Sequence, residues 1–544
     1  MAPTTKNRRS ATSPARQHEI GERQRLHELA QVLELEKDQL RGVPIPTLLA
    51  RAARLYARNG AAAREAPAET FALSHAVGRL DFFISHAWRS PRLAKYLALC
   101  RYFNGHLAVH AALLGCFLTF FWALHRAPIP GELMVQFPNR IDKGGVLTFP
   151  MAAFNWHHVS FFAYLATAAL AHQLLRRRQT AFLDIACVNQ LDDTSKALGI
   201  QRLGAVLQRT ERMLVLADEH YWKRLWCVFE VAAFCRHANA SRLVILPLHS
   251  PMIELGMGVF FHLALSVVLF KGLVITGEMD QSGGITQTYV SKLLITFAFL
   301  FQPFIILPIL GGQRSRRALR ALRDFSIADA QCYSAEDRAA LVAVICSWYT
   351  DYQAGEVDPE RLQQLGQHKF ETFVRHDLAP AIERQQAGEA ARVGFICAVT
   401  SLLPPLLVAN TSDESTVIHM ALALVYLTAI LAAVFPFVVL WYEAITSATG
   451  RLIEDGISRL SSPAMRRLLT AVTCAICLPI TAAALPLCSV LLGAVRLNVH
   501  LSPDWRIPAD DGFDTETRRY LKHFMVLAYY YMLFMIVDFR SSSR

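Results

Sequence analysis

Five side chains stand at positions where the folded chain could carry out chemistry. Glu230 lies four residues after Trp226, so within a helix both project from the same face, one turn apart. Ser85, His86 and Trp88 lie close together at the end of a short apolar run. A carboxylate can stabilise positive charge that develops during a reaction, and polar groups at the end of a buried strand are well placed to bind a ligand. These five residues are therefore the first candidates for a functional site.

The segment around Glu230 shows alternating strand and helix patterns. Residues 181–188 and 213–217 are short apolar runs typical of buried parallel strands. Residues 194–210 carry apolar side chains at helical spacing, and residues 221–237 form a second predicted helix. Strand, helix, strand and helix in succession predict a parallel sheet flanked by helices.

An earlier segment belongs with this pattern. Residues 81–88 form an apolar strand that ends in a polar turn, and a helix is predicted over residues 91–103. The carboxyl ends of parallel strands face the ligand crevice of such sheets, which would bring Ser85, His86 and Trp88 to that crevice. The alternative interpretation is a buried polar turn with Trp88 in the core.

Three motifs in these segments resemble those of Toll/interleukin-1 receptor (TIR) domains. The sequence DFFISHAW at residues 81–88 resembles the opening strand of that family. The sequence FLDIACVNQ at residues 182–190 resembles its second strand and the loop that follows. RLWCVFE at residues 224–230 resembles the WC-x-x-E helix of its plant and enzymatic members. The resemblance covers residues 79–247 and implies a flavodoxin-like parallel sheet.

The resemblance also implies an activity. In TIR domains that cleave NAD, a glutamate at the position of Glu230 is essential for breaking the nicotinamide–ribose bond. A catalytic role for Glu230 would follow, because an anion stabilises the positive charge left on the ribose. Ser85, His86 and Trp88 would contact the nucleotide. A solvated or salt-bridged helix residue is the alternative interpretation of Glu230.

The remaining motif residues have a structural interpretation. Asp184 precedes the loop that the family uses for self-assembly, and it could equally cap a turn. Packing is the expected role of Trp226 and Cys227. The residues that the resemblance assigns to structural motifs are Asp81, Asp184, Trp226 and Cys227.

The composition predicts a membrane protein. Of the 544 residues, 53% are hydrophobic and only 18% are charged, whereas soluble domains average about 25% charged residues. The net charge of +11 is typical of basic cytoplasmic loops, and without a basic-aromatic motif it does not indicate nucleic acid as a partner. The 11 cysteines are scattered and no zinc-binding spacing is present, so neither a disulfide framework nor a metal site is predicted.

Long apolar runs predict about eight transmembrane helices, because roughly 20 apolar residues span a bilayer. Two helical hairpins would interrupt the TIR-like sheet, and an even number of spans would keep its strands on one side of the membrane. The predicted fold class is therefore α/β plus a membrane all-α region. The predicted spans are residues 106–124, 158–175, 252–275, 290–310, 393–409, 417–442, 468–495 and 524–537.

These assignments divide the chain into segments. In chain order they are a disordered basic tail (1–17), a helical N-terminal segment (18–78), a first TIR-like segment (79–105), a transmembrane hairpin (106–175), a second TIR-like segment (176–250), a second transmembrane hairpin (251–310), a cytosolic segment that could complete the TIR-like domain (311–391) and a C-terminal membrane region with four transmembrane helices (392–544). Residues 325–327 are a candidate last strand of the sheet.

Three functions are compatible with this organisation. The first is a multi-pass membrane protein whose cytosolic TIR-like domain hydrolyses NAD in signalling. The second keeps the architecture but has a domain that only self-associates, TIR to TIR, or recruits partners. The third is a channel or transporter regulated by that domain. In each, the lipid bilayer is a partner and both termini are cytosolic, whereas the organelle is not identified and enzymatic activity stays open.

Overall fold

The computed structural model describes about half of the chain. The described residues are 39–56, 66–125, 134–138, 146–150, 156–174, 178–191, 202–238, 240–275, 302–350, 359–385 and scattered positions between 444 and 525. They fall into two compact units. Unit 1 comprises Met1–Tyr96, Arg176–Leu248 and Arg317–Gln385, and unit 2 comprises Leu97–Leu175, His249–Arg316 and Gln386–Arg544.

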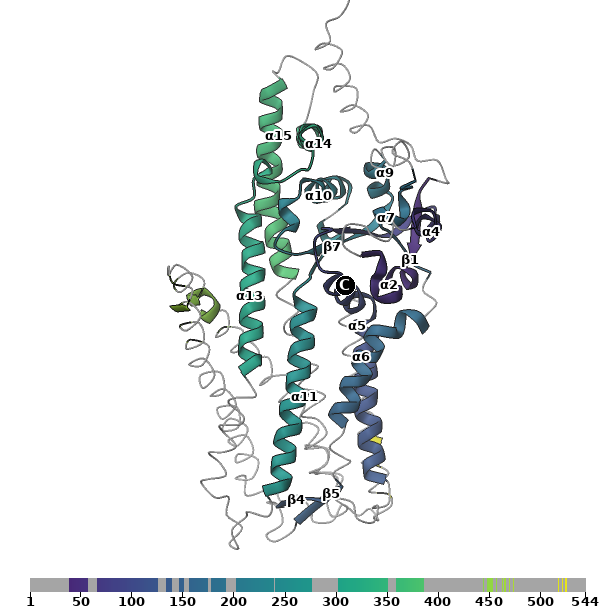
Figure 1. Cartoon of the computed structure of the whole chain (residues 1–544), viewed down its shortest axis with the longest axis vertical. Coiled ribbons are helices and arrows are strands. Elements are labelled where there is room, and N and C mark those ends of the chain that lie inside the picture. Colours follow the sequence, from purple (N-terminus) through teal and green to yellow (C-terminus); the bar gives the residue numbers. More distant parts are fainter. Residues whose placement is uncertain are drawn as a thin grey trace, which may run out of the picture. The chain divides into compact units, whose positions relative to one another are not determined.

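A six-stranded sheet forms the centre of unit 1, in the order β2-β1-β6-β3-β7-β8. Figure 1 labels its strands β1 and β7. Strands β3, β6, β7 and β8 run parallel, and β1 pairs antiparallel with both β2 and β6. The strands are β1 (Arg41–Pro44), β2 (His75–Ala76), β3 (Leu80–His86), β6 (Thr180–Phe182), β7 (Thr210–Ala217) and β8 (Leu243–Pro247). The sheet is therefore mixed, which corrects the prediction of a wholly parallel one.

The parallel strands join segments that are distant in the sequence. Phe82 and Phe83 of β3 lie opposite Ala181 and Phe182 of β6, and the rings of Phe83 and Phe182 stack with centroids 5.0 Å apart. If the four parallel strands are numbered in chain order, β3 is the first, β6 the second, β7 the third and β8 the fourth. Their order across the sheet is then 2-1-3-4, which is the order of flavodoxin-like doubly wound sheets. Two strands separated by about ninety residues are thus direct neighbours.

The extra strand β1 lies in the N-terminal segment predicted to be helical, where the Gly-Val-Pro sequence at residues 42–44 is expected to end a helix that begins at residue 19. Gly42 of β1 packs against Thr180, and a Cβ atom at Gly42 would lie 2.9 Å from the Cβ of Thr180. Only glycine permits this approach of β1 to β6. The glycine that looks like a helix terminator is therefore a requirement of strand packing.

Asp81 fixes the start of β3 to the start of β6. Its Oδ2 accepts hydrogen bonds from the Thr180 backbone N–H at 2.7 Å and from the Thr180 hydroxyl at 3.4 Å. Thr180 is buried, so loss of the carboxylate leaves a buried donor without a partner. The Asp81 side chain is thus a structural clamp at the end of the strand opposite Ser85.

We expect Asp81→Ala to lower the free energy of unfolding by about 1–3 kcal/mol, the usual cost of an unpaired buried polar group. Asp81→Asn keeps an acceptor oxygen and serves as the matched control, with a smaller loss. Chemical denaturation of the full chain followed by fluorescence measures both. Equal stability of Asp81→Ala and the wild type would show that the clamp contributes nothing.

Helices lie against the sheet of unit 1, and several have clear local causes. α10 ends in Arg236 and His237, whose basic side chains interact favourably with the negative end of the helix dipole. α14 begins at Ser334, whose hydroxyl accepts a hydrogen bond from the Asp337 backbone N–H at 3.3 Å. The longer helical elements of unit 1 are α2 (Ile45–Ala53), α4 (Pro67–Ala72), α9 (Leu203–Gln208), α10 (Leu225–His237), α14 (Ala335–Trp348) and α15 (Pro359–Phe373).

The segment after residue 317 packs on the sheet unit. The ring of Phe229 on α10 lies 5.2 Å from that of Trp348 on α14, and these helices are neighbours in Figure 1. Gln331 also exchanges backbone hydrogen bonds with Lys223 and Leu225, at 2.7 and 2.9 Å. The candidate last strand at 325–327 is wrong, because Ser326 caps a 3-10 turn, η6 (Ile327–Asp329), instead.

Unit 2 contains long helices and one hairpin. Its helices are α5 (Arg92–His125, whose first turn belongs to unit 1), α6 (Trp156–Leu174), α11 (Ser250–Ile275) and α13 (Gln302–Arg323, which ends in unit 1). The hairpin pairs β4 (Met134–Pro138) antiparallel with β5 (Val146–Pro150), within residues 126–156, which the sequence predicts as an external loop between the first two spans. Asn104 of α5 donates a hydrogen bond to the Ala168 carbonyl of α6 at 2.9 Å.

The prediction of about eight membrane-spanning helices is contradicted. Within the described ranges, no helix combines the length and the apolar character needed to cross a bilayer. Within the predicted span 252–275, Glu254 of α11 pairs with Arg101 of α5 at 2.9 Å. Residues 290–301 of the fourth predicted span lie outside the described residues. The four predicted C-terminal spans, like the basic tail, lie almost entirely outside the described residues.

Candidate functional site

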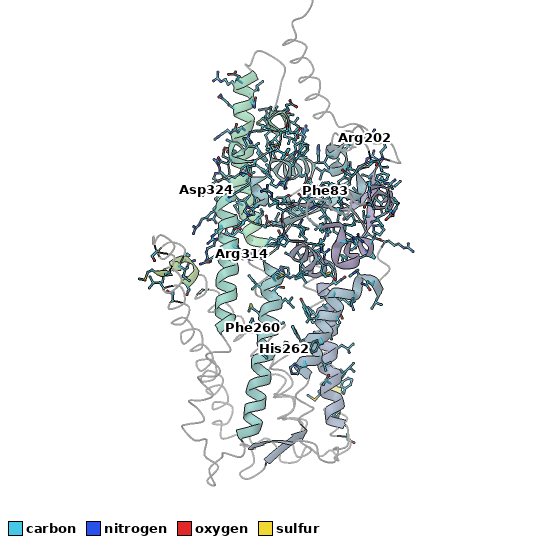
Figure 2. All side chains as sticks on the ribbon, in the orientation of Figure 1. Phe83, Arg202, Phe260, His262, Arg314 and Asp324 are labelled. Atoms are coloured by element: carbon cyan, nitrogen blue, oxygen red, sulfur yellow. The ribbon has the colours of Figure 1, made fainter. Side chains whose placement is uncertain are left out.

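The strand order of unit 1 defines where a ligand would bind. The chain passes from β3 to β6 on one side and reaches β7 on the other, so the gap between β3 and β7 is a topological switch point. Doubly wound sheets bind ligands outside the carboxyl ends of their strands at such a point. Ser85 and His86 are the last residues of β3, and Asp218 directly follows β7. Figure 2 marks β3 by Phe83, among the densely packed side chains of unit 1.

Ser85 and Glu230 are in direct contact, although 145 residues separate them. The buried Ser85 hydroxyl donates a hydrogen bond to Oε2 of Glu230. The Tyr221 hydroxyl lies 2.5 Å from the Ser85 hydroxyl and donates to the Cys227 carbonyl at 3.5 Å. Tyr221, Ser85 and Glu230 thus form a chain of hydrogen bonds that fixes the carboxylate at the end of β3.

The Glu230 carboxyl group is held in an environment that disfavours its charge. Burial raises its pKa to about 8, and the nearby carboxylate of Asp184 adds to the rise. The Ser85 hydrogen bond and the positive charge of Arg224 act in the opposite direction but do not offset burial. A carboxyl group whose pKa is raised towards neutral pH is a frequent property of catalytic acids and bases.

A second group of side chains surrounds His86. The His86 ring lies 4.4 Å from the Trp88 ring and 5.2 Å from the Tyr56 ring, both edge to face. The ammonium nitrogen of Lys95, on the first turn of α5, lies 5.9 Å from the centroid of Tyr56 and 5.7 Å from that of Trp88. We call Tyr56, His86, Trp88 and Lys95 the His86 cluster.

Three polar atoms of the His86 cluster are buried without a hydrogen-bond partner. They are the Tyr56 hydroxyl, Nε2 of His86 and Nζ of Lys95, and the exposed fractions of these residues are 0%, 8% and 0%. Each such group costs about 1–3 kcal/mol, and more when it is charged. Burial lowers the pKa of Lys95 to about 8 and lowers that of His86 well below its usual value. Unpaired polar groups gathered at a switch point indicate a site built for a ligand.

The acidic residues beside the cluster already have partners. Asp184 accepts hydrogen bonds from the Trp88 indole N–H at 3.3 Å and from the Ile185 backbone N–H at 2.8 Å. Its pKa is raised, mainly by burial. Asp218 accepts from the Ser90 hydroxyl at 2.5 Å and from the His220 backbone N–H at 3.0 Å. These carboxylates are therefore hydrogen-bonded to neighbouring residues, and neither forms an ion pair with Lys95.

The remaining motif residues have structural roles. Asp81 lies at the opposite end of β3. Trp226 packs edge to face against Phe229, with ring centroids 6.0 Å apart. The buried Cys227 thiol points to the His86 carbonyl at 3.9 Å, and burial, followed by the Glu230 charge, raises its pKa well above the usual value. Cys227 is therefore a protonated packing residue and no nucleophile.

The predicted strand at 181–188 is shorter in the structure. After β6 the chain forms a short helix, α7 (Asp184–Cys187), because the Asp184 carboxylate binds the next backbone N–H. Asp184 is therefore the first residue of α7 and hydrogen-bonds to Trp88, whereas the sequence placed it at the end of a strand that precedes a loop. Residues 192–201, which include the start of the predicted helix 194–210, lie outside the described residues.

Sequence reasoning missed Tyr56, Lys95 and Tyr221. Lys95 did leave a signal: with Ala98 and Leu99 it occupies one face of the predicted helix, and a lysine on an apolar face is unusual. Tyr56 left none, because it belongs to the N-terminal segment, outside the motifs. Tyr221 follows a polar turn and is an ordinary core aromatic by type.

Comparisons with known proteins add no relative: no family model, no curated protein and no solved structure matches the chain. Among the described residues, no group of three or more His, Cys, Asp or Glu side chains is arranged to hold a metal ion. The arrangement that can act chemically is therefore the Glu230 carboxyl group beside the unpaired polar atoms of the His86 cluster.

Proposed function

We propose that the protein hydrolyses NAD at the nicotinamide–ribose bond, with Glu230 as the catalytic carboxylate. The observation that carries the proposal is the hydrogen-bonded Glu230 at the switch point, next to buried polar atoms that have no partner. The choice of NAD over other nucleotides is supported by the resemblance of residues 224–230 to the WC-x-x-E helix of the plant and enzymatic TIR domains, beside two further TIR-like motifs.

The reaction assigns a simple task to each group. The bond between C1′ of the ribose and the pyridinium nitrogen breaks, and its electron pair leaves with neutral nicotinamide. The ribose becomes positively charged, and the Glu230 carboxylate stabilises that charge across the crevice. Water then forms a bond to C1′ and loses a proton, which gives ADP-ribose. Ser85 and Tyr221 act as positioning residues, because they hold Glu230.

The test is release of nicotinamide and ADP-ribose from NAD by the purified full chain, followed by chromatography. Equimolar appearance of the two products is the expected result. If the wild type releases no nicotinamide, the hydrolase proposal fails. A domain that only self-associates would then be favoured by concentration-dependent assembly measured by light scattering on the same sample.

We expect the rate to increase with pH. Because burial raises the pKa of Glu230 to about 8, its carboxylate form is in the minority at pH 7 and predominates only above pH 8. The pH profile of kcat/KM reports the free enzyme and should rise with an apparent pKa of about 8. The profile of kcat should rise at lower pH, because the bound pyridinium cation favours the carboxylate.

Parallel pH profiles of nicotinamide release at low and at saturating NAD measure both quantities. A rate that falls as pH rises from 6 to 9 would contradict the assignment, since it would make the protonated form of Glu230 the active one.

A further inference from the structure

We infer that the His86 cluster binds a ribose through its hydroxyl groups, and that Lys95 and Tyr56 thereby distinguish nucleotides that carry a second, terminal ribose from those that end in a phosphate. The inference rests on the proposed function only in taking the sugar to be that of NAD or ADP-ribose. Its basis is the set of three unpaired polar atoms, which lie on different elements: Tyr56 on η1 (Arg54–Tyr56), His86 on β3 and Lys95 on α5.

The hydrogen-bonding character of the three atoms decides the type of ligand. Lys95 Nζ can only donate. The His86 ring is neutral, because burial and then the Lys95 charge lower its pKa. Its hydrogen bond to the Ile84 backbone raises the pKa, so the ring donates in that bond and Nε2 carries the lone pair. The site therefore presents a hydrogen-bond donor in Lys95, an acceptor in His86 Nε2, and in Tyr56 a hydroxyl that can donate or accept.

A hydroxyl group satisfies this combination, whereas a phosphate does not. A sugar hydroxyl can accept from Lys95 and donate to His86 Nε2 at the same time. A phosphate has only acceptor oxygens at neutral pH and would face the His86 lone pair. The carboxylates of Asp184 and Asp218, which both act on the Lys95 charge, would also repel it. Arg224 is the other cation whose charge reaches Lys95.

The position of the cluster agrees with a ribose next to the reacting bond. Ser85, which binds Glu230, and His86, which belongs to the cluster, are consecutive residues of β3, so their side chains leave the strand on opposite faces and the two groups can meet a common ligand only beyond its carboxyl end. The Asp184 charge raises the pKa of both Tyr56 and Glu230, so one carboxylate lies near both groups. A ribose held by Lys95 and His86 would thus have its C1′ atom on the side of Glu230.

The test compares ADP-ribose with ADP, which lacks the terminal ribose, by calorimetric titration of the full chain. The wild type should bind ADP-ribose at least about 10-fold more tightly than ADP, the gain expected from one or two hydrogen bonds. Lys95→Met should weaken ADP-ribose binding by about 10- to 100-fold, and Tyr56→Phe by about 5-fold, with little effect on ADP. The exposed residues Lys223 and Tyr333 supply matched controls, Lys223→Met and Tyr333→Phe, which should bind as the wild type does.

Two results would overturn the inference. One is equal affinity of the wild type for ADP-ribose and ADP. The other is a parallel loss of both ligands in the two variants together with competition by inorganic pyrophosphate, which would make the cluster an anion site. Tyr56→Phe removes a single oxygen atom, so it keeps the test valid if Lys95→Met does not fold. Binding needs no turnover: selective binding without nicotinamide release would reject the hydrolase and keep the ribose site.

Discussion

Glu230→Gln is expected to lower the rate of nicotinamide release by about 10²–10³-fold, the usual loss when one preorganised electrostatic group is removed. Glutamine has almost the same shape and can still accept a hydrogen bond from Ser85, so the fold should persist. It carries no negative charge and cannot stabilise the positive ribose. The loss should therefore appear in kcat, with the affinity for ADP-ribose changed little.

The measurement is best made at pH 8.5, above the pKa of about 8 that burial gives Glu230, so that the wild type carries the charge. Glu336→Gln, an exposed first-turn residue of α14, is the matched control and should retain full activity. Ser85→Ala should cause an intermediate loss, because it releases Glu230 without removing its charge. Equal rates for Glu230→Gln and the wild type would remove Glu230 from the mechanism.

Lys95→Met is expected to stabilise the ligand-free protein by about 2 kcal/mol, because it replaces a buried amine that has no partner by an apolar side chain of similar length. The thermal midpoint should rise by several degrees, although the same change weakens ligand binding. Stabilisation combined with loss of function is characteristic of a residue kept for a ligand. If Lys95 instead stabilised the fold, Lys95→Met would lower the thermal midpoint.

The gain should depend on pH in a defined direction. Burial lowers the pKa of Lys95 from 10.5 to about 8, so the unfolded chain takes up the proton first and the folded protein loses stability as pH falls from the higher pKa to the lower one, with no further loss below it. The advantage of Lys95→Met should therefore be fully present at pH 7 and should shrink towards pH 10. Scanning calorimetry of both proteins at the two pH values measures it, with Lys223→Met as an exposed control. A lower midpoint for Lys95→Met at pH 7 would contradict the prediction.

The local sequence was sufficient to predict the centre of the sheet. Apolar runs that end in polar turns gave strands at 81–88, 181–188 and 213–217, and in the structure these segments contain β3, β6 and β7. The same runs indicated Ser85 and His86, because a strand that is buried on both faces can present polar groups only at its end. The four-residue spacing of Trp226 and Glu230 placed the carboxylate on α10.

Contacts between distant segments could not be predicted in this way. β1 exists only because Gly42 fits against Thr180, and nothing in the local pattern of 41–44 indicates that partner. Tyr56 reaches the site through the same N-terminal segment. The Ser326 turn likewise depends on one side chain that caps its own backbone.

The predicted membrane spans show a different limit. An apolar run indicates that a helix is covered, but does not identify what covers it. In α5, Ala112, Leu113 and Cys116 of the predicted span 106–124 are buried by protein atoms. Gly115 lies close to α6, where a Cβ atom would be 3.4 Å from that of Ala163. The hydropathy of a window therefore does not by itself show what surrounds a helix.

A structure of the full chain with ADP-ribose bound tests most directly the claim that the crevice between β3 and β7 is a nucleotide site. We predict that the terminal ribose lies within hydrogen-bonding distance of Lys95 Nζ and His86 Nε2, with its C1′ atom towards the Glu230 carboxyl group. ADP-ribose bound elsewhere, with the three polar atoms still unpaired, would contradict it.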